Sequence, residues 1–280
     1  PYWDESAYYL FEATEIDRLE RATQELHDMC IEAVDHVIVN GRLDELSIPA
    51  YFHPYIHASW QRDERSIYGR FDLSYDGVGP PKLLEYNADT PTALLEAAVI
   101  QWFWFQDVIE DRLEHEQAGL DQFNSIHEAL IEAWRRVKRD YGSHVHFSSL
   151  TEPTEDVMTV TYLRDTAAQA GLKTLFLGVG EIGWDGRRGV FTDTRERPIE
   201  ILFKLYFWEW MIREAFGRFL PESRMRWLEP PWKMVLSNKA ILPILWELFP
   251  GNPYLARAEF EPFGDSYVIK PILAREGANI

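Results

Sequence analysis

Residues 70–87 read RFDLSYDGVGPPKLLEYN, two short alternating segments around a run rich in glycine and proline. Alternation of polar and apolar residues is typical of half-buried strands, and the run 76–81 provides a turn between them. We therefore expect a hairpin of two strands, 70–75 and 82–87.

The register of this hairpin decides which side chains share a face. A pairing of Tyr75 with Lys82 places four polar side chains on one face, namely Arg70, Asp72, Glu85 and Asn87. The two carboxylates then lie directly opposite each other and repel by up to about 1 kcal/mol in a bare sheet. A divalent cation reverses the sign of that interaction, because carboxylate and amide oxygens are ligands that Mg²⁺ prefers. The guanidinium beside them suits a phosphate oxygen, to which it can donate two parallel hydrogen bonds.

The alternative is an ordinary solvent-facing hairpin surface. The opposite face would then turn to the core, and it carries Phe71, Leu73, Leu84 and Tyr86. A register slip of one residue would put the two carboxylates on different faces and would remove the metal site.

Outward from the hairpin, helical and strand patterns alternate along the chain. Apolar residues at three- and four-residue steps predict a long amphipathic helix at 14–39. Thr90 followed by Pro91 predicts the cap and first residue of a helix that runs to about Ile109. The other expected elements are helices 122–141, 156–170, 208–219 and one from Ser237 to before Pro250, strands 144–148, 174–178, 199–205 and 266–270, and a loop at 178–189. This order predicts an α/β (α+β) fold in which helices cover a partly parallel sheet.

Several cations stand where they could meet phosphate groups. Lys270 ends the last expected strand and leads into a basic loop with Arg275 and Gly277. Cations stabilise a transferring phosphate, and glycine permits close backbone approach to it. Lys239 falls in the first turn of the last expected helix, where the helix dipole favours an anion. An exposed basic loop and a solvated lysine are the plainer alternatives, and Lys204, within an aromatic run, is open to either a functional or a surface role.

The composition limits the kinds of partner. The chain of 280 residues is 46% hydrophobic, enough for a packed core, and its formal net charge is -18. Such a surface repels nucleic acids and anionic membranes and is compatible with a cationic amine. Cys30 is the only cysteine, so we expect no internal disulfide and a reducing, cytoplasmic setting. The apolar run 97–108 is too short and too polar to cross a bilayer.

Five motifs in order resemble the synthetase region of the glutathionylspermidine synthase family over nearly the whole chain. They are YGRFD at 68–72, LEYNAD at 84–89, SNK at 237–239, VIKPI at 268–272 and REGAN at 275–279. The pattern is especially similar to bacterial acid–amine ligases that lack the family's cysteine amidase domain. It implies an ATP-grasp-like synthetase fold, which we expect to be truncated at the C-terminus before the adenine-hinge region.

The resemblance also implies an organisation and a set of site residues. The expected regions are 1–115 with the metal-binding hairpin, 116–235 as an α/β substrate domain, and 236–280 as the start of the ATP-binding subdomain. Catalytic roles are implied for Arg70 and Arg275. The implied metal ligands are Asp72, Glu85 and Asn87, and the implied ATP-binding residues are Arg70, Lys239, Lys270 and Gly277.

One segment departs from the glutathione-using members of the family. Those members resemble Ser-x-Ser-Cys where this chain has Thr90-Pro91-Thr92-Ala93. Thr90 and Thr92 remain candidates for binding an anionic substrate group at the helix N-terminus. The cysteine has no counterpart, so the acid substrate is left open.

The resulting expectation is a ligase that uses ATP and Mg²⁺ to join a small-molecule or peptide carboxylate to an amine, with polyamines among the candidates, through an acyl phosphate. One alternative is a non-catalytic nucleotide- or partner-binding protein that retains the fold. Another is a hydrolase in which Asp72 and Glu85 form an acid/base pair without ATP.

Overall fold

The centre of the fold is a four-stranded parallel sheet in the order β4-β3-β7-β8. The computed structural model describes residues 7–110, 120–152 and 154–274. The strands are β3 (His144–Ser149), β4 (Lys173–Gly178), β7 (Ile201–Leu205) and β8 (Arg226–Leu228). The predicted parallel sheet is therefore confirmed, and β8 was not predicted because three residues are too few to show alternation.

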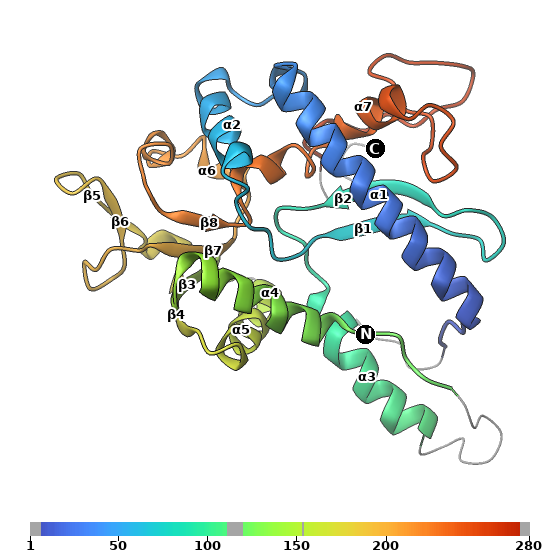
Figure 1. Ribbon diagram of the computed structural model, residues 1–280, viewed down its shortest axis with the longest axis horizontal. Coiled ribbons are helices and arrows are strands. Elements are labelled where there is room, and N and C mark those ends of the chain that lie inside the picture. Colours follow the sequence, from blue (N-terminus) through green and yellow to red (C-terminus); the bar gives the residue numbers. More distant parts are fainter. Residues whose placement is uncertain (1–6, 111–119, 153, 275–280) are drawn as a thin grey trace.

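Helices cover both faces of this sheet (Figure 1). On one face lie α4 (Ile126–Tyr141) and α5 (Thr154–Gln169), whose core includes Trp134 packed 5.3 Å from Phe147 between ring centroids. On the other face lie α2 (His53–Gln61) and α6 (Trp208–Met211), where the Trp208 ring lies 5.2 Å from that of Trp227. The side chains of the central strand β7 are therefore enclosed between two apolar layers, as are those of β3 beyond His144.

The helix α1 (Ala13–Val39) confirms the prediction for 14–39. Its buried residues include Leu26, Cys30, Val34 and Val37, spaced so that they share one face. Burial raises the pKa of the Cys30 thiol to about 12, so this cysteine is a packing residue and not a nucleophile. None of the helices within the described ranges is long and apolar enough to span a membrane.

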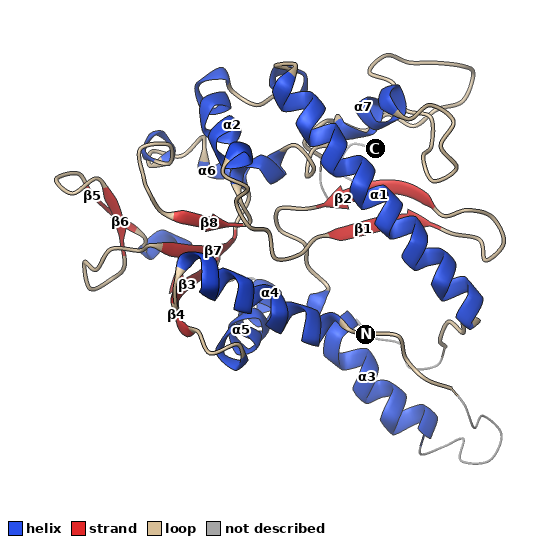
Figure 2. Ribbon diagram, viewed as in Figure 1, coloured by secondary structure: helices blue, strands red, loops and turns tan. Residues whose placement is uncertain are grey.

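The predicted hairpin forms from β1 (Arg70–Ser74) and β2 (Lys82–Asn87), drawn as a separate two-stranded sheet in Figure 2. Its antiparallel register pairs Asp72 with Glu85 as predicted. A bulge follows, so Lys82 pairs with Ser74 and not with Tyr75.

The bulge changes which leucine of β2 enters the core. Leu83 is 3% exposed and Leu84 is 40% exposed, so the prediction that Leu84 faces the core is wrong. An extra residue in one strand reverses the side to which the residues beyond it point.

The helix predicted from Thr90 starts later than expected. It consists of π-helical η3 (Glu96–Ile100), α3 (Gln101–Trp104) and π-helical η4 (Phe105–Glu110), with its first helical turn at Leu94. Ala93 has a left-handed φ of 60°, which cannot continue a right-handed helix. The predicted cap at Thr90 is therefore wrong, and residues 90–93 form an irregular segment.

Three further expectations differ from the structure. The helix predicted at 208–219 ends at Met211, and the chain beyond it folds back so closely that a Cβ on Gly217 would lie 2.6 Å from the Met211 carbonyl oxygen. The loop predicted at 178–189 contains β5 (Gly183–Asp185), which forms a small hairpin with β6 (Val190–Thr192) just after the predicted loop. The segment 266–270 pairs with no strand in the described structure, so the predicted strand there is wrong.

The remaining elements are short, apart from the last helix. That helix, α7 (Ile241–Leu248), packs beside α1 and begins four residues later than predicted. The 3-10 turns are η1 (Leu43–Leu46), η2 (Ala50–Phe52), η5 (Val179–Glu181), η6 (Gly217–Phe219) and η7 (Pro231–Met234). The division of the chain into regions 1–115, 116–235 and 236–280 stays a prediction.

Candidate functional site

A cavity of about 360 Å³ opens over the polar face of the hairpin. The cavity is lined by residues from the hairpin, from the irregular segment after it and from both sides of the α7 N-terminus. They include every predicted site residue within the described ranges, which are Arg70, Asp72, Glu85, Asn87, Thr90, Thr92, Lys239 and Lys270. Arg275 and Gly277 lie outside the described residues.

Arg70 and Asp72 form a two-point ion pair along β1. Arg70 Nε lies 2.8 Å from Asp72 Oδ1 and its Nη2 lies 3.2 Å from Oδ2, while Nη1 donates to the Thr92 carbonyl at 3.2 Å. The hydrogen bonds to Asp72 raise the pKa of the Arg70 guanidinium, which therefore stays charged. The contact with Thr92 also ties the irregular segment to the hairpin face.

Glu85 is surrounded by donors. Its Oε2 lies 3.0 Å from Lys239 Nζ, and its Oε1 accepts a 2.8 Å hydrogen bond from Asn87 Nδ2. Burial alone would raise the pKa of Glu85, but the hydrogen bonds from Lys239 and Asn87 and the charges of Lys239 and Lys270 leave it below its ordinary value. The side chain is therefore a carboxylate at neutral pH.

This pKa shift predicts a pH-dependent stability difference. The folded pKa of Glu85 is lower than in the unfolded chain, so ionised Glu85 stabilises the fold above the ordinary glutamate pKa of about 4.3. That contribution is lost as the pH falls through the lower folded value. Glu85→Gln should lower the free energy of unfolding at neutral pH and should match the wild type in acid.

The measurement is urea unfolding of both proteins at neutral and acidic pH. Glu20→Gln, on the exposed face of α1, is the control with the same chemical change. A Glu85→Gln difference of the same size at both pH values would contradict the assignment.

Lys239 and Lys270 reach the hairpin from the C-terminal part of the chain. Lys239 Nζ also donates to the Ala274 carbonyl, and its backbone N–H donates to the Ile272 carbonyl at 3.0 Å. Lys270 Nζ donates to the Leu84 carbonyl at 3.1 Å. Both ammonium groups therefore lie against β2, close to the Glu85 carboxylate.

The expected position of Lys239 within a helix is wrong. It precedes Ala240, the N-cap of α7, and so lies outside the first helical turn. Asn238 shapes this turn by donating to the Leu46 carbonyl at 2.6 Å and by accepting a hydrogen bond from the Ala240 N–H at 3.0 Å. The partner of Lys239 is the carboxylate of Glu85, and the helix dipole is not needed to explain its place.

The donor set of the hairpin fits Mg²⁺. No group of three or more His, Cys, Asp or Glu side chains suited to a metal exists among the described residues, so a hairpin site needs the amide oxygen of Asn87 as its third ligand. Asn87 Nδ2 lies 2.8 Å from Glu85 Oε1 and 3.4 Å from Asp72 Oδ2. Turning this amide over would direct its oxygen to the same place, since the two amide orientations are nearly isosteric.

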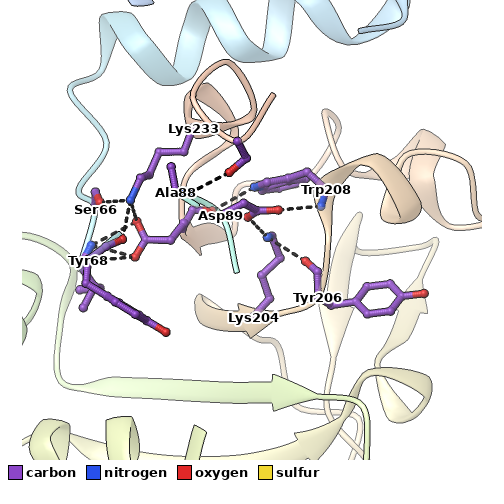
Figure 3. A network of polar contacts seen from close by, with 11 residues as sticks. Ser66, Tyr68, Ala88, Asp89, Lys204, Tyr206, Trp208 and Lys233 are labelled. Carbon is purple, nitrogen blue, oxygen red and sulfur yellow. Dashed lines mark hydrogen bonds and ion pairs between the residues drawn. The ribbon is translucent and has the colours of Figure 1, made fainter. Parts of the chain in front are cut away.

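A buried ion pair attaches the end of β2 to the parallel sheet (Figure 3). Asp89 and Lys204 are each 1% exposed and form this pair. Lys204 Nζ also donates to the Tyr206 carbonyl at 2.9 Å, and Asp89 Oδ2 accepts the Trp208 N–H at 2.9 Å. Lys204 is therefore a buried structural cation, and Asp89 is a site-supporting residue that the sequence interpretation missed although it stands in the LEYNAD motif.

A second buried ion pair holds the chain that enters β1. Glu229 pairs with Lys233 at 2.9 Å, and both side chains are buried. Glu229 Oε1 accepts the N–H groups of Ile67 and Tyr68 at 2.9 and 3.1 Å, and Lys233 Nζ donates to Ser66 Oγ at 2.7 Å. Both ends of the hairpin are thus fixed to the region around the carboxyl ends of β7 and β8.

Comparison with solved structures supports the fold alone. The apo structure of a glutathione synthetase-like effector, GSS30 from Globodera pallida, has a TM-score of 0.55 at 10% identity. The alignment covers 86% of this chain and 57% of that one.

Sequence relatives are synthetases and ligases. A Haemophilus influenzae protein named "Putative acid--amine ligase" is 42% identical over 286 residues, which cover 100% of this chain and 71% of that protein. The bifunctional glutathionylspermidine synthetase/amidase of Escherichia coli is 30% identical over 98% of this chain. The trypanothione synthetase of Crithidia fasciculata is 28% identical over 91% of it. The chain spans 47% of the Escherichia coli enzyme and 42% of the Crithidia enzyme.

Fold and relatives together define a class, that of the ATP-grasp-like synthetases, which are ATP-dependent carbon–nitrogen ligases. Within it, the model of the glutathionylspermidine synthase preATP-grasp family matches residues 1–280. The chain belongs to that family, which confirms the resemblance seen in its motifs.

Proposed function

We propose that the protein uses ATP and Mg²⁺ to form an amide between a carboxylate and an amine, through an acyl phosphate. The observation that carries the proposal is the convergence of eight predicted residues, from segments 70–92 and 239–270, on one cavity. Two carboxylates, an amide and three cations in one cavity form a set that metal-assisted phosphoryl transfer needs. Family membership and the synthetase relatives support the same reaction.

The residues of the chain have distinct roles in this proposal. Asp72, Glu85 and Asn87 would hold Mg²⁺, which supplies charge neutralisation for the phosphates when bound. Lys239 and Lys270 would bind the phosphates of ATP. To do so, Lys239 would release the Glu85 carboxylate and Lys270 would release the Leu84 carbonyl. We also propose that Arg275 and Gly277 belong to the loop over the transferred phosphate.

Arg70 is proposed as the catalytic cation nearest the metal ligands. Its guanidinium already donates to Asp72 and to the Thr92 carbonyl, so it joins the metal-binding face to the substrate side of the cavity. A rigid guanidinium in that place can stabilise charge on the phosphoryl oxygens as the carboxylate attacks.

Thr90 and Thr92 are proposed to bind the acid substrate. The hydroxyl oxygen of Thr90 is buried and has no hydrogen-bond partner among the described residues, although it belongs to a cavity-lining residue. A buried hydroxyl without a partner is unfavourable by about 1–3 kcal/mol, and a substrate carboxylate would accept its hydrogen bond. The amine is left as a class, and the net charge of -18 favours the approach of cationic amines such as polyamines.

The test is product formation by the full-length protein with ATP, Mg²⁺ and a panel of carboxylates and amines. We expect ADP and phosphate release to require both organic substrates, and we expect a product whose mass equals acid plus amine minus water. Omission of either substrate and chelation of Mg²⁺ are the controls. ADP release that no pair accelerates would contradict ligation, and ATP binding without turnover would support the non-catalytic alternative.

A further inference from the structure

A second cavity, of about 370 Å³, lies between α2 and the segment 221–226 that leads into β8. It shares no lining residue with the hairpin cavity. None of the described residues assigned above to metal, ATP or substrate lines it, so the charged residues of this cavity need a separate explanation.

The charge of this second cavity is opposite to that of the protein as a whole. Three arginines line it, Arg62, Arg224 and Arg226, and Glu64 is the only carboxylate among its described lining residues. The excess of two positive charges contrasts with a formal net charge of -18 for the chain. Like charges gathered in one cavity repel each other, and a bound anion would offset that repulsion.

Glu64 holds two of the guanidiniums in fixed positions. Its Oε1 lies 3.0 Å from Arg62 Nε and 2.8 Å from Arg226 Nη1, and its Oε2 accepts a 2.6 Å hydrogen bond from Ser59 Oγ. The Glu64 side chain is 6% exposed, whereas those of Arg62 and Arg226 are 42% and 40% exposed. A buried carboxylate thus orients two accessible guanidiniums, each of which keeps further N–H donors for a ligand.

Arg224 adds a third cation to this cavity. It forms no hydrogen bond or ion pair with any residue in the described part of the chain. The rest of the wall is largely apolar and includes Tyr55, Pro221 and Met225. The cavity therefore offers a cationic region beside an apolar one.

We propose that this cavity binds a small dianion carried on a compact apolar group, a phosphate monoester being the ligand class that fits it. Guanidinium groups match phosphate oxygens through paired hydrogen bonds, and the apolar wall would cover the organic part of the ligand. The site is separate from the hairpin cavity and does not depend on the ligase reaction proposed above.

Calorimetric titration with phenyl phosphate tests the proposal. The protein for this experiment carries Lys239→Gln and Lys270→Gln, which remove the two lysines of the hairpin cavity. We expect one equivalent to bind at constant ionic strength. Adding Arg224→Gln should weaken binding about tenfold, the effect of losing one charge-assisted hydrogen bond. Arg224 is an exposed residue, so this variant should fold normally.

Two controls define the outcomes. Arg195→Gln, at another exposed arginine, should leave the affinity for phenyl phosphate unchanged. Inorganic phosphate, which lacks the apolar group, should bind more weakly than phenyl phosphate. Absence of binding, or equal affinity with and without Arg224, would overturn the site, and tighter binding of succinate than of phenyl phosphate would overturn the phosphate assignment.

Discussion

Asp72→Asn should lower the rate of ATP-dependent amide formation by a factor of roughly 10²–10³, the loss typical when a main electrostatic group of an active site is removed. Asp72 is a proposed metal ligand, and its carboxylate also receives two of the hydrogen bonds that orient Arg70. Asparagine keeps the shape but removes the charge that a divalent cation requires. The measurement is steady-state turnover of the full-length protein on the substrate pair found in the panel assay.

Metal affinity provides a readout of Asp72 that does not depend on turnover. Titration with Mn²⁺ as a paramagnetic substitute for Mg²⁺ should show weaker binding to Asp72→Asn than to the wild type. Asp76→Asn is the matched control, since Asp76 lies in the turn of the same hairpin and accepts hydrogen bonds from the Val78 and Gly79 N–H groups at 2.9 and 2.7 Å. Normal turnover and Mn²⁺ affinity in Asp72→Asn would show that the hairpin is not the metal site.

Lys204→Met should destabilise the fold by about 3–5 kcal/mol, because it leaves a buried carboxylate without its countercharge. Asp89 is 1% exposed and would keep only the Trp208 N–H as a partner among the contacts described above. The pair joins the end of β2 to β7, so its loss should also loosen the hairpin. Urea unfolding followed by circular dichroism measures the change.

Two further variants keep this prediction testable if Lys204→Met does not fold. Asp89→Asn retains an oxygen that can accept the Trp208 N–H, but it leaves the buried Lys204 ammonium without its countercharge, so a loss of the same order is expected. Lys138→Met makes the same side-chain change at an exposed position of α4 and should shift stability by less than about 0.5 kcal/mol. A Lys204→Met protein as stable as the Lys138→Met control would contradict a structural role for the pair.

The sequence predicted the part of the candidate site whose residues lie close together in the chain. Asp72 and Glu85 lie in one hairpin, and alternation plus a turn are sufficient to set them opposite each other. The bulge beyond them could not be predicted from the sequence, because Leu83 and Leu84 are chemically identical and only packing decides which one is buried.

Elements that depend on distant partners were predicted less well. The segment 266–270 has strand-forming residues but no hydrogen-bonded neighbour in the described structure. The helix predicted at Thr90 is displaced by a left-handed residue at Ala93, a conformation that alanine rarely adopts and that no local pattern announces. The role of Lys204 was open for the same reason, since its partner Asp89 lies 115 residues away.

The sequence by itself determined the α/β class, the family and the chemical types at the site, because periodicity and short motifs are local properties of the chain. Only the tertiary structure decided how these residues work together. It brought Lys239 to Glu85, Lys270 to the hairpin edge and two buried ion pairs to its ends. Those contacts join segments far apart in sequence, and their geometry is set by the packing of the whole core and not by local preference.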